Sequence, residues 1–229
     1  MNIKLVVFDI AGTTVKDNGE IVTAFWNALK EYGYTVPKEK INALMGYKKP
    51  EAIRRIVEEY EDNKDRITEE YIDAIHERFL ALMLDYYRHA EEIVPLPNVL
   101  DVFSFLKENN VKIGLDTGFS KDITGVIIHR LGWLADGVID YVVSSDEVPA
   151  GRPQPYMIQR MMSEASVDDA KEVIKVGDTE VDVQEGKNAG CRYSIAVTTG
   201  AFTRKELEPY QPSFIIDDIK ELVAIISNN

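Results

Sequence analysis

Six short apolar runs constrain what this chain can fold into more than any other feature. They lie at residues 3–8, 112–115, 140–143, 173–176, 194–197 and 214–216. The first run, IKLVVF, is continuous rather than alternating, which is typical of a strand covered on both faces in a parallel sheet. Helical patterns separate most of the runs, and strands that alternate with helices form βαβ units with right-handed crossovers. The sequence therefore predicts an α/β fold built on a parallel sheet.

A long stretch after the first run has no good strand candidate and is rich in Glu, Lys, Tyr, Ile and Leu. Its apolar spacing predicts helices, which we expect at about 20–33, 38–45, 50–61 and 68–90. The segment VPLP at 94–97 is typical of a linker that leads back to the sheet. We therefore expect a core of residues 1–15 and 94–229 and an all-helical cap of residues 16–93. Such a cap could act as a lid over the strand ends.

Charge and composition exclude several classes of partner. The formal net charge is −13 and the pI about 4.7, which argues against nucleic acid and against an anionic membrane surface. An anionic substrate is still compatible, because an Arg, a Lys or a metal ion can reverse the field inside a pocket. The single cysteine, Cys191, excludes an intramolecular disulfide and suits a reducing compartment. No signal peptide and no apolar stretch of about 20 residues is found, so we expect a soluble cytoplasmic protein.

Four polar segments carry the chemistry of the chain. They are Asp9 in FDIAGTT, Thr117 in LDTGFS, Arg152 in AGRPQP, and Asp178 with Asp182 in VGDTEVD. Three of the four segments directly follow a predicted strand, where open α/β sheets bind their ligands. A nucleophilic carboxylate, a hydroxyl, a cation and a pair of metal-binding acids are the groups that attack on phosphorus requires. The sequence therefore predicts a phosphoryl-transfer site.

Each segment taken alone also has a structural explanation. Asp9 suits a helix N-cap or a turn, and Thr117 suits a turn that its own hydroxyl stabilises. Arg152 could be a solvated surface cation. The acids at 178 and 182 are four residues apart, which would place them on one face of a helical turn, and acids at a helix start also favour its dipole. A Gly-Asp pair at the end of a buried strand makes that last explanation weaker.

Together the four ordered segments resemble the haloacid dehalogenase superfamily of aspartate-nucleophile hydrolases, over nearly the whole chain. The sequence is most similar to the phosphonoacetaldehyde hydrolase, or phosphonatase, branch. The similarity rests on FDIAGTT at 8–14, DEVPAGRPQPYM at 146–157 and VIKVGDTEVDVQEGKNAG at 173–190. The resemblance implies a Rossmann-like core with a helical cap inserted after the first strand, which agrees with the division above.

The resemblance also implies a nucleophile and a metal site. Asp9 would attack phosphorus and form an aspartyl-phosphate. A Mg²⁺ ion would be held by the Asp9 carboxylate, the Ala11 backbone carbonyl and Asp178, with Asp182 in support.

The remaining implied roles concern the substrate. Thr117 and Gly118 would hold phosphoryl oxygens, because a hydroxyl and a backbone N–H can both donate and glycine allows a close approach. Arg152 would balance the charge of the nucleophile and the phosphoryl group. The implied substrate-binding residues are Ala11, Gly12, Met45, Gly46, Thr117 and Gly118.

Ala11 separates this chain from ordinary phosphatases of the superfamily. Those enzymes carry a second aspartate there, which protonates the leaving group and activates water, and alanine can do neither. In the phosphonatase branch, a cap lysine instead forms a Schiff base whose iminium accepts the electrons of the breaking P–C bond. The pattern around that lysine is Met-Gly-x-x-Lys, which here is residues 45–49 and places Lys49 in the role. Burial and the adjacent charge of Lys48 would lower its pKa; the alternative is a solvated cap lysine.

Three positions depart from the phosphonatase pattern. Where the phosphonatase pattern has a histidine three residues after the lysine, this chain has Ala52. Where the pattern has a tyrosine in the Thr-Gly loop, this chain has Phe119, and the cysteine that the pattern places near Gly19 is absent. These departures leave the exact substrate open, together with the choice between C–P and P–O cleavage.

Four functions compete. The first is a Mg²⁺-dependent phosphonatase-like hydrolase acting on a small anionic phosphonate or phosphorylated metabolite; the second is an ordinary phosphate monoester phosphatase of the phosphoglycolate or sugar phosphate type. A haloalkanoate dehalogenase attacks carbon and needs no metal, which the acids at 178 and 182 argue against. A non-catalytic binding protein on this scaffold would usually have lost the nucleophile or the metal acids. The oligomeric state stays open, with a homodimer as one option.

Overall fold

The computed structural model describes residues 3–228, and its centre is one sheet of six parallel strands. The strands are β1 (Leu5–Asp9), β2 (Lys112–Thr117), β3 (Tyr141–Ser144), β4 (Val173–Gly177), β5 (Tyr193–Val197) and β6 (Phe214–Ile216). Their order in the sheet is β3-β2-β1-β4-β5-β6. The chain therefore builds one half of the sheet outward from β1 and then crosses to β4, which makes the end of β1 the switch point where such sheets bind ligands. The predicted α/β class is confirmed.

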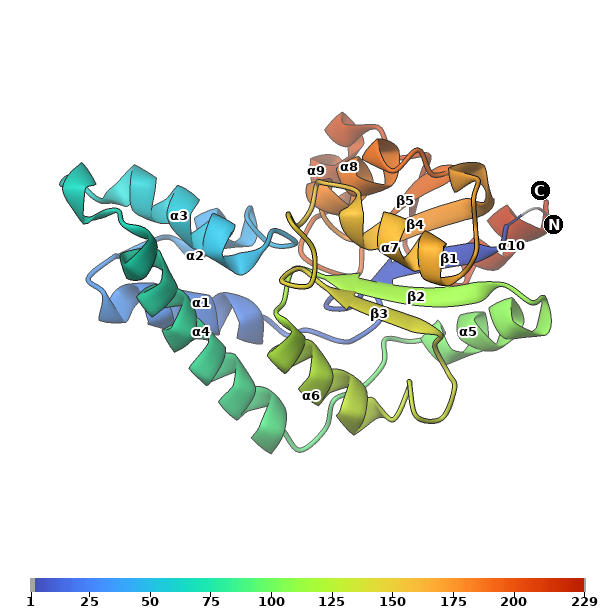
Figure 1. Ribbon diagram of the computed structural model, residues 1–229, viewed down its shortest axis with the longest axis horizontal. Coiled ribbons are helices and arrows are strands. Elements are labelled where there is room, and N and C mark those ends of the chain that lie inside the picture. Colours follow the sequence, from blue (N-terminus) through green and yellow to red (C-terminus); the bar gives the residue numbers. More distant parts are fainter. Residues whose placement is uncertain (1–2, 229) are drawn as a thin grey trace.

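Helices cover both faces of the sheet, with α5 and α6 on one side and α7 and α8 on the other (Figure 1). The helices of this part of the chain are α5 (Val99–Glu108), α6 (Lys121–Leu131), α7 (Tyr156–Glu164), α8 (Glu180–Asn188), α9 (Arg204–Leu207) and α10 (Glu221–Ser227). The packing of β1 explains why its sequence is apolar throughout. Val6 and Phe8 belong to one core cluster, whereas Leu5 and Val7 belong to the cluster on the opposite face. Alternate side chains thus point to opposite faces, and both faces are buried.

Four helices form a separate group, which we call the helical unit (Figure 1). They are α1 (Glu20–Glu31), α2 (Lys38–Asn42), α3 (Lys49–Tyr60) and α4 (Glu69–His89). The unit has its own apolar interior, in which the rings of Phe25 and Phe79 lie 5.5 Å apart. No strand occurs between β1 and β2, as expected, although the boundaries proposed for core and cap stay predictions.

One predicted helix ends earlier than expected. We predicted a helix at 38–45, but α2 ends at Asn42. A turn follows and leads to Gly46, whose φ of 84° favours glycine. The turn redirects the chain, so that α3 begins at Lys49.

Between residues 3 and 228, no helix combines the length and the apolar composition that crossing a bilayer requires.

Candidate active site

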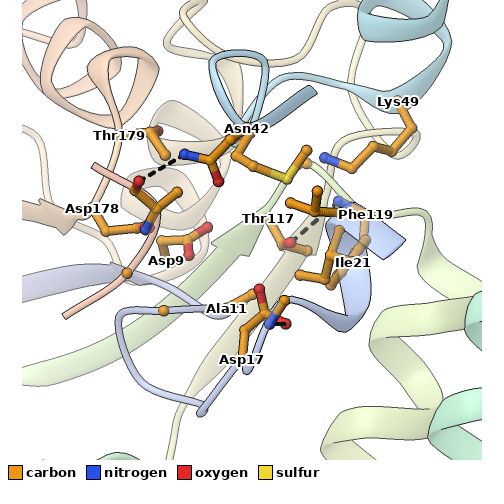
Figure 2. Close-up of a pocket in the computed structure, with 18 residues that line it drawn as sticks. Asp9, Ala11, Asp17, Ile21, Asn42, Lys49, Thr117, Phe119, Asp178 and Thr179 are labelled. Atoms are coloured by element: carbon orange, nitrogen blue, oxygen red, sulfur yellow. Dashed lines mark hydrogen bonds between the residues drawn. The ribbon is translucent and has the colours of Figure 1, made fainter. Parts of the chain in front are cut away.

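A cavity of about 180 Å³ lies at the carboxyl ends of the central strands, between the sheet and the helical unit (Figure 2). The site residues predicted from the sequence line it, with the exception of Arg152 and Asp182. The lining residues among them are Asp9, Ala11, Gly12, Met45, Gly46, Lys49, Thr117, Gly118 and Asp178. The structure therefore brings segments from both parts of the chain to one small space.

Asp9 is the last residue of β1 and is 5% exposed. Its Oδ1 lies 2.7 Å from Nη1 of Arg152. Burial raises the pKa of Asp9 to about 6, even though the charge of Arg152 opposes the shift. The carboxylate is therefore mostly ionised at pH 7, which its predicted role as a nucleophile requires.

Arg152 does not line the cavity, and its side chain is fully buried. Besides Asp9, it pairs with Asp116 and with Asp182, whose Oδ1 lies 3.0 Å from Nη1. Burial works against the cation, but the surrounding carboxylates, Asp116 first, raise the pKa of Arg152 well above its ordinary value. These contacts agree with the prediction that the Arg152 cation is held in place. The structure shows its contact with Asp9, and contact with a phosphoryl group stays a prediction.

Sequence reasoning missed a second buried cation, Lys175, in the middle of β4. Its Nζ lies 3.1 Å from Oε2 of Glu185 and 3.2 Å from Oδ1 of Asp182, and it also pairs with Asp116. The signal was present, because a lysine inside the apolar run VIKVG has no place in a strand covered on both faces unless it is paired.

Three carboxylates, from Asp9, Asp116 and Asp182, each offer an oxygen within 4.8 Å of the other two. That spacing would suit a metal ion. Arg152 contacts all three, however, and Lys175 contacts two of them. We conclude that buried cations already neutralise this cluster, so a metal is better sought nearer the cavity.

Asp178 is a candidate metal ligand nearer the cavity, because it is buried and lines the cavity together with Asp9. Within residues 3–228, its oxygens accept hydrogen bonds from two uncharged groups: Oδ1 from Thr13 Oγ1 at 3.3 Å and Oδ2 from Ala201 N at 2.6 Å. Burial, and then the charge of Asp9, raise the pKa of Asp178 well above its ordinary value. Two buried carboxylates that repel one another across a cavity fit a hard cation such as Mg²⁺.

The backbone around Asp178 is shaped to admit its carboxylate. A Cβ on Gly200 would lie 2.0 Å from Asp178 Oδ2, and one on Gly12 would lie 2.9 Å from the same atom. The two glycines therefore provide the space that this side chain occupies.

Asp182 occupies a different place from the one we expected. Helix α8 begins after its N-cap, Thr179, so Asp178 precedes the helix and the two acids do not share a helical face. That expectation was wrong because the four-residue spacing spans a cap rather than a turn. The Asp182 side chain forms a capping box with Thr179, and its other oxygen faces Arg152 and Lys175. Its supporting role at the metal stays a prediction.

Lys49 begins α3 and brings an amine to the cavity wall from the helical unit. It is 4% exposed, its Nζ donates to the Tyr47 carbonyl at 3.2 Å, and it lies 5.6 Å from the centre of the Phe119 ring. Burial lowers the pKa of Lys49 to about 8, while Asp9 opposes and Arg152 assists the shift. We expected the charge of Lys48 to help lower the pKa of Lys49, but the cation that does so is Arg152, and Lys48 is not among the main causes. A useful fraction of neutral amine is present at pH 7.

Glycines let the helical unit contact the strand ends. A Cβ on Gly118 would lie 2.5 Å from the Tyr47 carbonyl oxygen and 2.6 Å from that of Gly46. A Cβ on Gly46 would lie 2.4 Å from Thr179 Oγ1. Beside these contacts, the Tyr47 hydroxyl donates to Glu180 Oε1 at 2.8 Å. The segment that carries Lys49 therefore packs closely against the loops that carry Thr117 and Asp178.

With this geometry in view, the chain can be compared with known proteins. Its sequence matches the haloacid dehalogenase-like hydrolases over residues 6–197. The chain belongs to this family. It is similar to the phosphonoacetaldehyde hydrolase of Paraburkholderia phytofirmans, with 32% identity over 216 residues that cover 90% of this chain and 79% of the relative. It is also similar to the phosphonoacetaldehyde hydrolase of Bacillus mycoides, with 31% identity over 244 residues that cover all of this chain and 88% of the relative.

The fold agrees with that membership. The crystal structure of a hydrolase from Pseudomonas syringae superimposes with a TM-score of 0.85 and 18% identity, over 98% of each chain. The prediction of a haloacid dehalogenase-like hydrolase, and thus of an enzyme, is confirmed.

In this haloacid dehalogenase-like hydrolase, a Gly118→Ala substitution is expected to lower turnover by about 100-fold, because misplacing reacting groups by about 1 Å costs that much. The new methyl group would push the 46–47 carbonyls, and with them Lys49, away from Thr117. Steady-state kinetics would measure the loss. Gly125→Ala is the matched control, since a Cβ there meets nothing within 4 Å, and it should leave turnover unchanged. Equal activity in both variants would show that this contact does not position the site.

Proposed function

We propose that this hydrolase is a Mg²⁺-dependent, phosphonatase-like enzyme that cleaves the C–P bond of a small phosphonate aldehyde. The observation that carries the proposal is the pairing of a buried carboxylate, Asp9, with a buried lysine of lowered pKa, Lys49, in one cavity. Ala11 lines the same cavity and supplies no acid for a P–O leaving group. The relatives named phosphonoacetaldehyde hydrolase support the same substrate class.

The size of the cavity supports a small substrate. Its volume of about 180 Å³ is below the roughly 300–1,000 Å³ of pockets that hold drug-sized ligands. Lys49 is the one cation among the described residues that line the cavity, against the acids Asp9, Asp17 and Asp178, so the Mg²⁺ would supply the further positive charge that an anionic substrate needs. The cytoplasmic location and the homodimer stay predictions, which cell fractionation and sedimentation would test.

At the phosphorus end, Asp9 is the nucleophile. Arg152 holds Oδ1, so Oδ2 is the oxygen that attacks. The Thr117 hydroxyl accepts from Phe119 N at 3.2 Å, which leaves its own proton free to donate to a phosphoryl oxygen. Asp9, the Ala11 carbonyl and Asp178, with Asp182 in support, would hold the Mg²⁺, which supplies positive charge against the phosphoryl oxygens.

At the carbon end, Lys49 is the electrophile-forming residue. Its neutral amine adds to the aldehyde carbon and forms an imine, whose protonated form accepts the electron pair of the breaking C–P bond. Phe119 and Met45 line the cavity and limit the access of water to this intermediate. Cleavage leaves an enamine on Lys49, which takes a proton on its terminal carbon and becomes an iminium again. Water then hydrolyses this iminium to the aldehyde and the free amine, and a second water hydrolyses the aspartyl-phosphate.

Borohydride trapping tests the proposal. Wild-type protein treated with phosphonoacetaldehyde and borohydride should lose activity and carry one reduced adduct at Lys49, detected by peptide mass spectrometry. Lys49→Ala should turn over phosphonoacetaldehyde at least about 10³-fold more slowly, since removal of a covalent catalyst costs this much or more.

Lys48→Ala is the matched control for that experiment and should keep both the adduct and most of the activity. If no adduct forms and small phosphate esters are hydrolysed instead, the enzyme is an ordinary phosphatase. Activity that survives EDTA would instead support a haloalkanoate dehalogenase.

A further inference from the structure

One ionisable side chain of the cavity has no role in the chemistry above. The charged groups that line the cavity are Asp9, Asp17, Lys49 and Asp178. Asp9 serves the phosphorus, Asp178 the metal and Lys49 the aldehyde, which leaves Asp17. Imine formation needs a group that moves protons, and Ala11 cannot do so.

Asp17 is held in the loop between β1 and α1 and lines the cavity together with Lys49 (Figure 2). Its Oδ1 accepts from Gly19 N at 3.2 Å and from Glu20 N at 3.1 Å, so the carboxyl group is fixed by backbone donors. The residue is only partly exposed, and Phe119 lines the same cavity. These features describe a positioned carboxyl group rather than a solvated loop acid.

The charges around Asp17 suit a group that exchanges a proton near neutral pH. Burial, and then a hydrogen bond to Glu20 and the charge of Glu20, raise its pKa to about 6. Tyr86 and Tyr87 of α4 also face it, and both are uncharged at neutral pH because burial raises their pKa values. Among the acids whose charge favours protonated Lys49, Asp17 follows Asp9. Asp17 and Lys49 therefore interact across the cavity.

We propose that Asp17 is the acid–base residue that makes and breaks the imine at Lys49. This role rests on the proposed function, because it requires an aldehyde substrate and a Lys49 imine. It assigns to a loop of the core the proton transfers that Ala11 cannot perform.

The proton transfers balance without any other reactant. The Asp17 carboxylate takes a proton from the Lys49 ammonium group, and the neutral amine bonds to the aldehyde carbon. One nitrogen proton moves to the former carbonyl oxygen, which gives a neutral carbinolamine. The C–O bond then breaks, the hydroxyl takes the proton from Asp17 and leaves as water, and the nitrogen lone pair forms the C=N bond. Asp17 is again a carboxylate and now faces the iminium cation.

The test measures the rate at which borohydride traps the Lys49 adduct with phosphonoacetaldehyde. Asp17→Asn should slow trapping by about 100-fold, the lower end of what general acid–base catalysis contributes. Asparagine keeps an oxygen for the N–H groups of Gly19 and Glu20, so the loop should stay folded, which near-UV circular dichroism would check. Asp62→Asn, at an exposed carboxylate outside the cavity, is the matched control and should trap at the wild-type rate.

A second variant separates proton transfer from a structural role. Asp17→Ala should be equally slow, and added formate should restore part of the trapping rate, because formate can replace the missing carboxyl group. Trapping by Asp17→Asn at the wild-type rate, or a slow Asp17→Ala that formate does not restore, would overturn the role of Asp17 while the imine itself stands. If wild-type protein forms no Lys49 adduct, the proposed function fails, and the role of Asp17 fails with it.

Discussion

An Asp9→Asn protein is expected to turn over its substrate at least about 10⁴-fold more slowly than the wild type, which is the scale on which loss of a catalytic nucleophile acts. An amide cannot form the acyl-phosphate bond, so no phosphoenzyme should accumulate. Rapid quenching in acid followed by intact-protein mass spectrometry would measure that species, and phosphate release would measure turnover. The wild-type rate should also fall as the pH drops through about 6, because protonated Asp9 does not attack.

The control for Asp9→Asn is Asp62→Asn, which should match the wild type. Thermal unfolding of both variants would show that the loss is chemical, since asparagine still offers Arg152 an acceptor at the position of Oδ1. Wild-type turnover by Asp9→Asn, or a wild-type enzyme that forms no phosphoenzyme, would refute the nucleophilic role.

Replacing Lys175 with methionine should have the largest effect on stability. The lysine side chain is fully buried, and its removal leaves Asp116 and Glu185 without one of their two cations. Breaking a buried ion pair from one side costs about 3–5 kcal/mol, so the free energy of unfolding in urea should fall by that amount. For a chain of this size the melting temperature should drop by roughly 10 °C.

A surface lysine provides the comparison for Lys175→Met. Lys4 pairs with Glu172 at 2.9 Å, but its side chain is 59% exposed, so Lys4→Met should cost less than about 1 kcal/mol. The double variant Lys175→Met/Glu185→Met should recover part of the loss, because it removes a carboxyl group together with its cation. A loss for Lys175→Met as small as that for Lys4→Met would show that the buried network does not depend on this cation.

The fold followed from the sequence because its signals are local. A strand covered on both faces must be apolar along its whole length, and the six runs that meet this condition became β1 to β6. The residues that follow these strands gather at one edge because parallel strands all end there. This is why the sequence alone predicts that Asp9, Thr117 and Asp178 meet at one edge of the sheet, where they line one cavity.

The electrostatics of the site could not be predicted from the sequence in the same way. Nothing local distinguishes Asp182, which is turned toward two buried cations, from Asp178, which faces the cavity. The position of the helix N-cap at Thr179 decides which of the two acids lies before the helix and which lies within it. A shift of the helix start by one residue would change the direction of both side chains.

By itself, the sequence determined the class of fold, the order of the strands along the chain, and the set of side chains that strand ends bring together. Only the tertiary structure decided which of these groups are paired, which line the cavity, and how strongly each holds its proton. The reason is that desolvation and Coulomb interactions depend on distances between segments far apart in the chain. Lys49 illustrates this, because the pKa of its amine responds to burial, Asp9 and Arg152 rather than to its neighbour in the sequence, Lys48.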